Sequence, residues 1–207
     1  MSTPGAELPA DFIKYVILER VDSLKRLING EREEMLISFT RANPVVVTDG
    51  PAGLSGSVKM VGFIPKPEFL NEMLERARRL LKLPLSEVLK ELLNYFYDVR
   101  KLDLRRLGAL EMAFKHTWVN VRSTGRATLV FFTPPVTSYE VRCSVKIHED
   151  GPIKEYLNVL HDAYHGRGVA GRAPGDYPAY EFIIEEIYDQ SASRTGFGRL
   201  IFKAPQP

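Results

Sequence analysis

The 207-residue sequence has a single cysteine, a single tryptophan and almost no net charge. With only Cys143 present, a disulfide within the chain and a cysteine-based zinc site are excluded. The formal net charge of +2, from 28 basic and 26 acidic residues, gives no general attraction to nucleic acid or to a membrane. The sequence also lacks an apolar run that could span a bilayer and the pattern of a signal peptide. We therefore expect a cytoplasmic protein without nucleic-acid or membrane partners.

Two neighbouring runs in the second half of the chain carry the clearest strand patterns. Residues 128–132 are β-branched and aromatic and can be buried on both faces, whereas in residues 139–147 apolar and polar side chains alternate. Asp150-Gly151 ends the second run, and Pro152 stands where a helix can begin. This order predicts two strands followed by an amphipathic helix. Cys143 lies on the apolar side of its run, which predicts a buried thiol.

The remaining periodicities predict further strands and a helical layer. Apolar residues three and four apart indicate helices over residues 10–28, after Pro67, after Ser86 and over about 104–122. Shorter β-branched or alternating runs indicate strands at residues 34–40, 45–48, 57–64, 180–188 and 198–203. Six or seven strands with mostly short connections favour an antiparallel sheet or small barrel over a doubly wound sheet. Residues 166–178 are expected to form a loop.

Several short motifs surround the two clearest strands. They are Lys115-His116-Thr117, Asn120-Val121-Arg122, Thr124-Gly125-Arg126-Ala127-Thr128-Leu129, His148-Glu149-Asp150 and Tyr164-His165-Gly166. In this order they resemble the flavin-binding split barrels related to pyridoxamine-phosphate oxidase. The resemblance implies an α+β fold with an antiparallel split β-barrel and flanking helices, in one domain over residues 1–207. Because the family's upstream strands lie close before this helix, residues 65–110 are expected to contain a helical insertion.

The same resemblance implies FMN at a homodimer interface, a small-molecule substrate, and hydride or electron transfer at the flavin. A flavin phosphate needs a cation and hydroxyl or amide donors that converge. The candidate cofactor-binding residues are Lys115, His116, Thr117, Asn120, Arg122 and Arg126, with Ser57 and Lys59 on an upstream strand. The resemblance places the phosphate near Thr117, Asn120 and Arg126. A solvated helix end with ordinary basic residues is the alternative interpretation.

Two histidines four residues apart suggest a metal site, which the surrounding sequence does not support. His161 and His165 could bind one ion from a helix, but the sequence His-Asp-Ala-Tyr-His is not a zincin motif. A third ligand, such as His148, would have to come from elsewhere. We predict that the pair is not a metal centre.

Other functions stay open beside the flavin hypothesis. Basic residues between positions 76 and 106 could bind nucleic acid in a regulatory protein, although interleaved glutamates favour salt-bridged, solvated faces. A split-barrel dimer without a cofactor is a further alternative. The wide apolar stripe of residues 10–28 and the many aromatic side chains support a homodimer in each case. The sequence identifies neither the substrate nor the redox partner.

Overall fold

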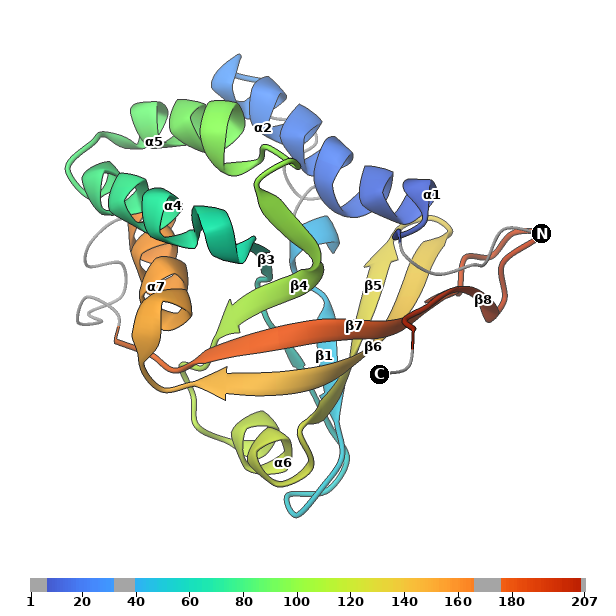
Figure 1. Ribbon diagram of the computed structural model, residues 1–207. Coiled ribbons are helices and arrows are strands. Elements are labelled where there is room, and N and C mark those ends of the chain that lie inside the picture. The colour runs from blue at the N-terminus through green and yellow to red at the C-terminus, as the bar shows by residue number, and fades with distance from the viewer. Residues whose placement is uncertain (1–6, 32–39, 166–175, 206–207) are drawn as a thin grey trace.

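The computed structural model describes residues 7–31, 40–165 and 176–205. In these residues one antiparallel sheet has the strand order β2-β1-β5-β6-β7-β4-β3, and β8 pairs with β7. The strands are β1 (Val45–Thr48), β2 (Ser55–Val58), β3 (Gly62–Pro65), β4 (Leu102–Leu110), β5 (Arg126–Thr133), β6 (Thr137–His148), β7 (Ala179–Asp189) and β8 (Arg199–Lys203). The sheet bends strongly, but β2 and β3 end the order without pairing, so it does not close (Figure 1). The predicted α+β split-barrel class is confirmed.

The pairing of β5 with β6 forms the centre of the core. Leu129 lies opposite Val141 and Phe131 lies opposite Tyr139, and all four side chains are buried. The next residues along each strand point to the other face, as the two-residue period requires. Cys143 is buried on the core side, and burial raises the pKa of its thiol. The expectation of a buried thiol is therefore confirmed.

Helices cover one side of this sheet and one end of it (Figure 1). A continuous helical rod comprises α1 (Ala10–Ile13), a π-helical segment (Lys14–Leu18) and α2 (Glu19–Ile28). Next come α4 (Pro67–Leu80), α5 (Leu85–Glu91) and a second π-helical segment (Leu92–Phe96), and α4 packs against α7 (Gly151–His165). The short α6 (His116–Thr124) lies at the opposite end of the molecule, against β1 and β2. The aromatic rings of Phe12 and Phe131 meet edge to face where α1 covers the core.

Four secondary-structure predictions need correction or fall outside the described residues. The helix predicted over 104–122 is wrong in its first half, because residues up to Leu110 form β4, a strand paired on both sides. Residues 57–64 form two strands, β2 and β3, instead of one. The strand predicted at 34–40 lies outside the described residues except for Thr40, and the loop at 166–178 lies outside them up to residue 175.

Gly108 explains why β4 can lie beneath α7. A Cβ atom at this position would lie 2.6 Å from Cδ1 of Leu157 on that helix. The leucine- and arginine-rich segment has good helix propensity, but two flanking strands and this close contact override it. The helical part of the predicted insertion therefore ends at Phe96, and β4 belongs to the sheet.

Candidate binding pocket

A pocket of about 850 Å³ lies between α2, α7, β4 and the segment that joins β2 to β3. Most of its wall is apolar, and the side chains concerned are Leu24, Leu27, Val61, Phe63, Leu157 and Leu160. Large concave sites with apolar walls and a few polar groups are typical of small-molecule binding. Its lining comes from segments as far apart in sequence as α2 and α7.

Charged side chains occupy separate parts of this wall. Arg20 and Arg26 enter from α2, Lys59 follows β2, and Glu31 is the one carboxylate among the described lining residues. His161 and His165 enter from α7. The pocket therefore combines an apolar interior with an excess of cationic groups over carboxylates, which favours an anionic ligand.

Lys59 is held by a buried carboxylate behind the pocket wall. Its Nζ donates to Oε2 of Glu111 at 3.0 Å, and the Tyr180 hydroxyl donates to the same oxygen at 2.6 Å. The other oxygen, Oε1, accepts the backbone N–H groups of Ala113 and Phe114. Burial alone would raise the pKa of Glu111, but these donors hold that pKa below its ordinary value. The carboxylate is therefore ionised at neutral pH and fixes the lysine beside the pocket.

The two histidines predicted to lie on one helix face do meet. Their ring centroids are 4.7 Å apart, and both side chains line the pocket. Burial lowers the pKa of His165, and the neighbouring His161 lowers it further. Among the described residues no three His, Cys, Asp or Glu side chains are arranged to hold a metal ion. The absence of metal stays a prediction.

Two of the predicted cofactor residues, Ser57 and Thr117, meet at one end of this region, and Lys59 lines the same pocket. Ser57 and Lys59 both line the pocket, and the Ser57 hydroxyl lies 2.9 Å from Oγ1 of Thr117 on α6. Thr117 is buried, so its hydroxyl is fixed in place. Ser57 and Lys59 therefore line this part of the pocket, and the buried Thr117 hydroxyl contacts Ser57.

Asn120 has a different place from the one expected. It is fully buried, and its Nδ2 donates to the Gly53 carbonyl at 2.7 Å and to Oγ1 of Thr48 at 3.2 Å. Its Oδ1 accepts the Ala52 N–H at 2.8 Å. These bonds tie α6 to the loop between β1 and β2, so both ends of the amide are already satisfied.

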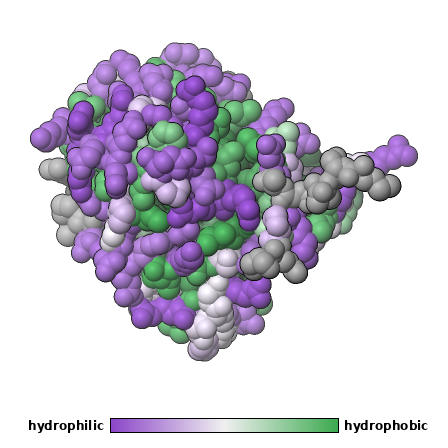
Figure 2. Space-filling model, in the orientation of Figure 1, coloured by the Kyte–Doolittle hydropathy of each residue, from purple (hydrophilic) through white to green (hydrophobic). Residues whose placement is uncertain are grey.

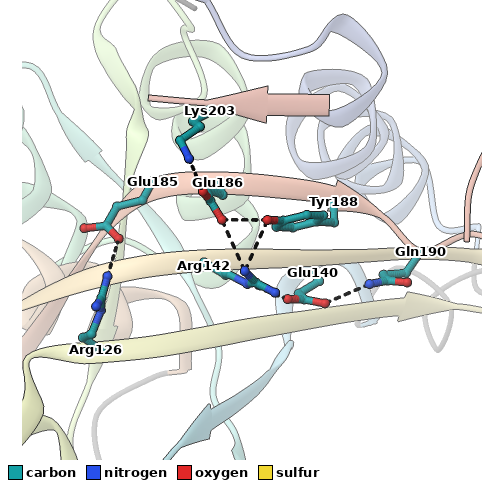
Figure 3. A network of polar contacts seen from close by, with 8 residues as sticks. All are labelled: Arg126, Glu140, Arg142, Glu185, Glu186, Tyr188, Gln190 and Lys203. Atoms are coloured by element: carbon teal, nitrogen blue, oxygen red, sulfur yellow. Dashed lines mark hydrogen bonds and ion pairs between the residues drawn. The ribbon is translucent and has the colours of Figure 1, made fainter. Parts of the chain in front are cut away.

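The other basic candidates lie on exposed surfaces. Lys115 and His116 are exposed at the start of α6, and Arg122 pairs with Glu149. Arg126 begins β5 and pairs with Glu185 on the outer face of the sheet. Figure 3 shows this pair beside a separate set of polar contacts on β6, β7 and β8 and the residue after β7, which joins Glu140, Arg142, Glu186, Tyr188, Gln190 and Lys203. The side chains of Thr117, Asn120 and Arg126 thus have different hydrogen-bond partners in the described residues, and their joint binding of a phosphate stays a prediction.

Sequence reasoning missed the helical wall of the pocket. Arg20 and Tyr97 read as parts of amphipathic helices, and nothing in their local pattern indicates that they face each other. The Arg20 Nη2 donates to the Tyr97 hydroxyl at 3.3 Å, and Nη1 donates to the Val61 carbonyl at 3.0 Å. A basic residue in the middle of an apolar stripe is the one signal that could have pointed to Arg20.

Solved structures similar to this chain include HupZ from Group A Streptococcus, which is 14% identical with a TM-score of 0.45 and covers 83% of this chain and 94% of its own. An F420 reductase is 14% identical with a TM-score of 0.43, covering 70% of this chain and 88% of its own. A Listeria innocua protein provisionally described as a pyridoxamine 5'-phosphate oxidase is 10% identical with a TM-score of 0.43, covering 82% and 96% respectively. No protein-family model and no curated protein sequence matches the chain.

The basic helical layer is largely neutralised. Arg76 pairs with Glu91, Arg78 with Glu155, Lys101 with Glu72 and Arg106 with Glu181. Polar side chains cover much of the face seen in Figure 2, with apolar patches between them. The paired charges disfavour the nucleic-acid alternative, because such binding needs unneutralised cations. None of the helices in the described ranges is long and apolar enough to cross a lipid bilayer.

Proposed function

We propose that this protein binds FMN in the pocket between α2, α7 and β4 and acts as a flavin-dependent oxidoreductase on a small molecule. The observation that carries the proposal is the pocket itself, which joins a large apolar interior to the side chains of Ser57 and Lys59, with the Thr117 hydroxyl 2.9 Å from that of Ser57. A planar flavin ring suits apolar walls, and its phosphate needs donors of these types.

The donor set fits a phosphate group, although it is smaller than the sequence led us to expect. Ser57 and Thr117 share one hydrogen bond, which leaves one hydroxyl proton for a ligand. Lys59 uses Glu111 as one partner, and an ammonium has three donors. Lys59 and the two hydroxyls would hold the phosphate, while the side chains of Leu157 and Leu160 would contact the ring.

Bound FMN would supply the redox chemistry by accepting or donating a hydride. The protein's part is to bind, to orient and to exclude water. The apolar wall keeps water from the reacting atoms, and Glu111 holds Lys59 in one position. His165, with its lowered pKa, is a neutral imidazole at neutral pH and would accept a proton from a bound substrate.

Removing the Lys59 ammonium is expected to weaken FMN binding about 10- to 100-fold. The reason is the loss of one charge-assisted hydrogen bond, which contributes roughly 1.5–3 kcal/mol. The variant should combine Lys59→Met with Glu111→Gln, so that no buried charge is left unpaired. Quenching of flavin fluorescence measures the affinity, and riboflavin, which lacks the phosphate, should bind this variant as it binds the wild type.

Two controls accompany this measurement. Glu111→Gln alone keeps the lysine and should retain most of the affinity. Arg126→Ala removes an exposed charge outside the pocket, so its FMN affinity should equal that of the wild type. Equal FMN affinity in the double variant, or a loss confined to Arg126→Ala, would contradict this placement of the phosphate.

We also propose that the protein is a homodimer joined through the outer face of β2, β1 and β5. Val45 lies opposite both Val58 and Val130, and Val45, Val58 and Phe132 are 38%, 66% and 52% exposed. β2 is also an edge of the sheet, and exposed apolar edges are normally covered.

Light scattering at micromolar concentration is expected to give the mass of a dimer. Phe132→Glu should give a monomer, because a carboxylate would be buried in the interface. Phe197→Glu changes a side chain that is 74% exposed in the turn before β8 and should leave the dimer intact. A wild-type monomer would contradict the proposal.

A further inference from the structure

Arg20 carries a charge that the described part of the protein does not neutralise. Its two hydrogen bonds go to neutral acceptors, the Val61 carbonyl and the Tyr97 hydroxyl. Two carboxylates close to it in sequence pair elsewhere, Glu19 with Arg41 and Asp22 with Lys25, and Glu31 lines the same pocket without an ion pair to Arg20 among the described residues. Half-buried guanidinium groups are normally matched by an anion. A purely structural role at this position would need hydrogen-bond donors and no charge.

Aromatic rings surround this guanidinium on several elements. The Cζ atom of Arg20 lies 5.4 Å from the ring centre of Phe63 on β3. It lies 5.7 Å from the ring centre of Tyr97, which follows the second π-helical segment. Burial raises the pKa of the Tyr164 hydroxyl on α7, and the charge of Arg20 partly opposes that shift, so this residue is also close. All four side chains line the pocket. Flat rings around a planar cation form a slot for a flat ligand.

The free donors of Arg20 point to the kind of group that completes this slot. A guanidinium has five N–H donors, and two are used within the described residues. A carboxylate can take a parallel pair of the remaining ones, with its attached ring among the aromatic side chains. This end is lined by Val61 and Phe63, whereas the donors assigned to the flavin phosphate are at Ser57 and Lys59.

We infer that the Arg20 end of the pocket binds the carboxylate of a planar aromatic or conjugated acid, and that such acids are the substrate class. The inference rests on the proposed function only in calling the acid a substrate. Arg20 is the group that selects the acid, and Phe63, Tyr97 and Tyr164 select its flat shape. Neutral compounds of the same shape lose the ionic hydrogen bonds and bind less well.

The test compares two probes of the same shape, 2-naphthoate and the neutral 2-naphthamide, by calorimetry with the full chain. Wild-type protein is expected to bind the acid at least about tenfold more tightly than the amide, as a charge-assisted hydrogen bond predicts. Arg20→Gln keeps neutral donors toward Val61 but removes the charge, and should remove this preference. Arg20→Lys keeps the charge without the paired donors and should give an intermediate preference. Lys25→Met, an exposed cation on the same helix, should change nothing.

The outcomes separate this inference from the proposed function. Equal binding of acid and amide to the wild type, or an unchanged preference in folded Arg20→Gln and Arg20→Lys, would overturn the inference. A loss of FMN affinity without loss of riboflavin affinity in Arg20→Gln would also overturn it, because Arg20 would then hold the flavin phosphate. A wild-type preference for the acid that depends on Arg20, together with no FMN binding, would support the acid site and remove the proposed flavin function.

Discussion

Replacing Glu111 with alanine is expected to lower the free energy of unfolding by about 3–5 kcal/mol, because it leaves the Lys59 charge without its buried partner. The Tyr180 hydroxyl and the N–H groups of Ala113 and Phe114 would lose their acceptors as well. For a chain of this size the melting temperature should fall by roughly 6–20 °C. Differential scanning calorimetry measures the change.

The ionisation of Glu111 also makes the free energy of unfolding depend on pH, and stability decreases as the pH falls. The pKa of Glu111 in the folded protein lies below its ordinary value of 4.5. The ionised carboxylate therefore contributes fully to the free energy of unfolding above pH 4.5. The contribution is lost as the pH falls through the folded pKa. Glu181 is a second buried carboxylate of this kind, where burial opposes the shift and Arg106 and His148 lower the pKa.

A conservative variant isolates the contribution of Glu111 to this behaviour. Wild-type stability should fall steeply below about pH 4.5, and Glu111→Gln should show a shallower fall because one titrating group is gone. Glu68→Gln, an exposed site at the start of α4, is the matched control and should follow the wild-type curve. If the stability of Glu111→Gln and of the wild type fell identically below about pH 4.5, the Glu111 carboxylate would not take up a proton on unfolding.

The second large effect is expected from Asn120→Ala, which should lower the free energy of unfolding by about 2–4 kcal/mol. Three hydrogen bonds join this side chain to the β1 strand and its loop, and the Ala52 N–H and the Gly53 carbonyl would lose their partner. The loop packs closely here, since a Cβ atom on Gly50 would lie 3.0 Å from Oδ1 of Asn120. Chemical denaturation monitored by circular dichroism measures the loss.

This experiment also decides between a structural role and a cofactor-binding role for Asn120. Ser123→Ala, at an exposed position of the same helix, should change stability by less than about 0.5 kcal/mol. Loss of a structural amide lowers stability, whereas loss of a cofactor ligand lowers FMN affinity and leaves stability unchanged. Unchanged stability with weakened FMN binding in Asn120→Ala would return this residue to the site that the sequence suggested.

The order of β5, β6 and α7 could be predicted because its signals are local. Alternation along β6, the turn at Asp150-Gly151 and the apolar stripe of α7 each fix structure within a few residues. The burial of Cys143 follows from the same alternation. The place of Arg126 was harder to predict because residues 128–132 read as apolar on both faces. In the sheet Ala127 and Leu129 point inward, so Arg126 points outward to Glu185.

The sequence by itself determined the strand-rich α+β class, the split-barrel resemblance and the neutral charge balance, since each depends on composition or short-range period. Only the tertiary structure decided that Leu102–Leu110 is a strand, because its neighbours β3 and β7 supply the hydrogen bonds that a helix would otherwise make. Only the tertiary structure brought Arg20, Tyr97 and Tyr164 to one pocket and placed Glu111 behind Lys59. Contacts between segments far apart in the chain depend on how helices pack on the sheet, and no local pattern specifies that packing.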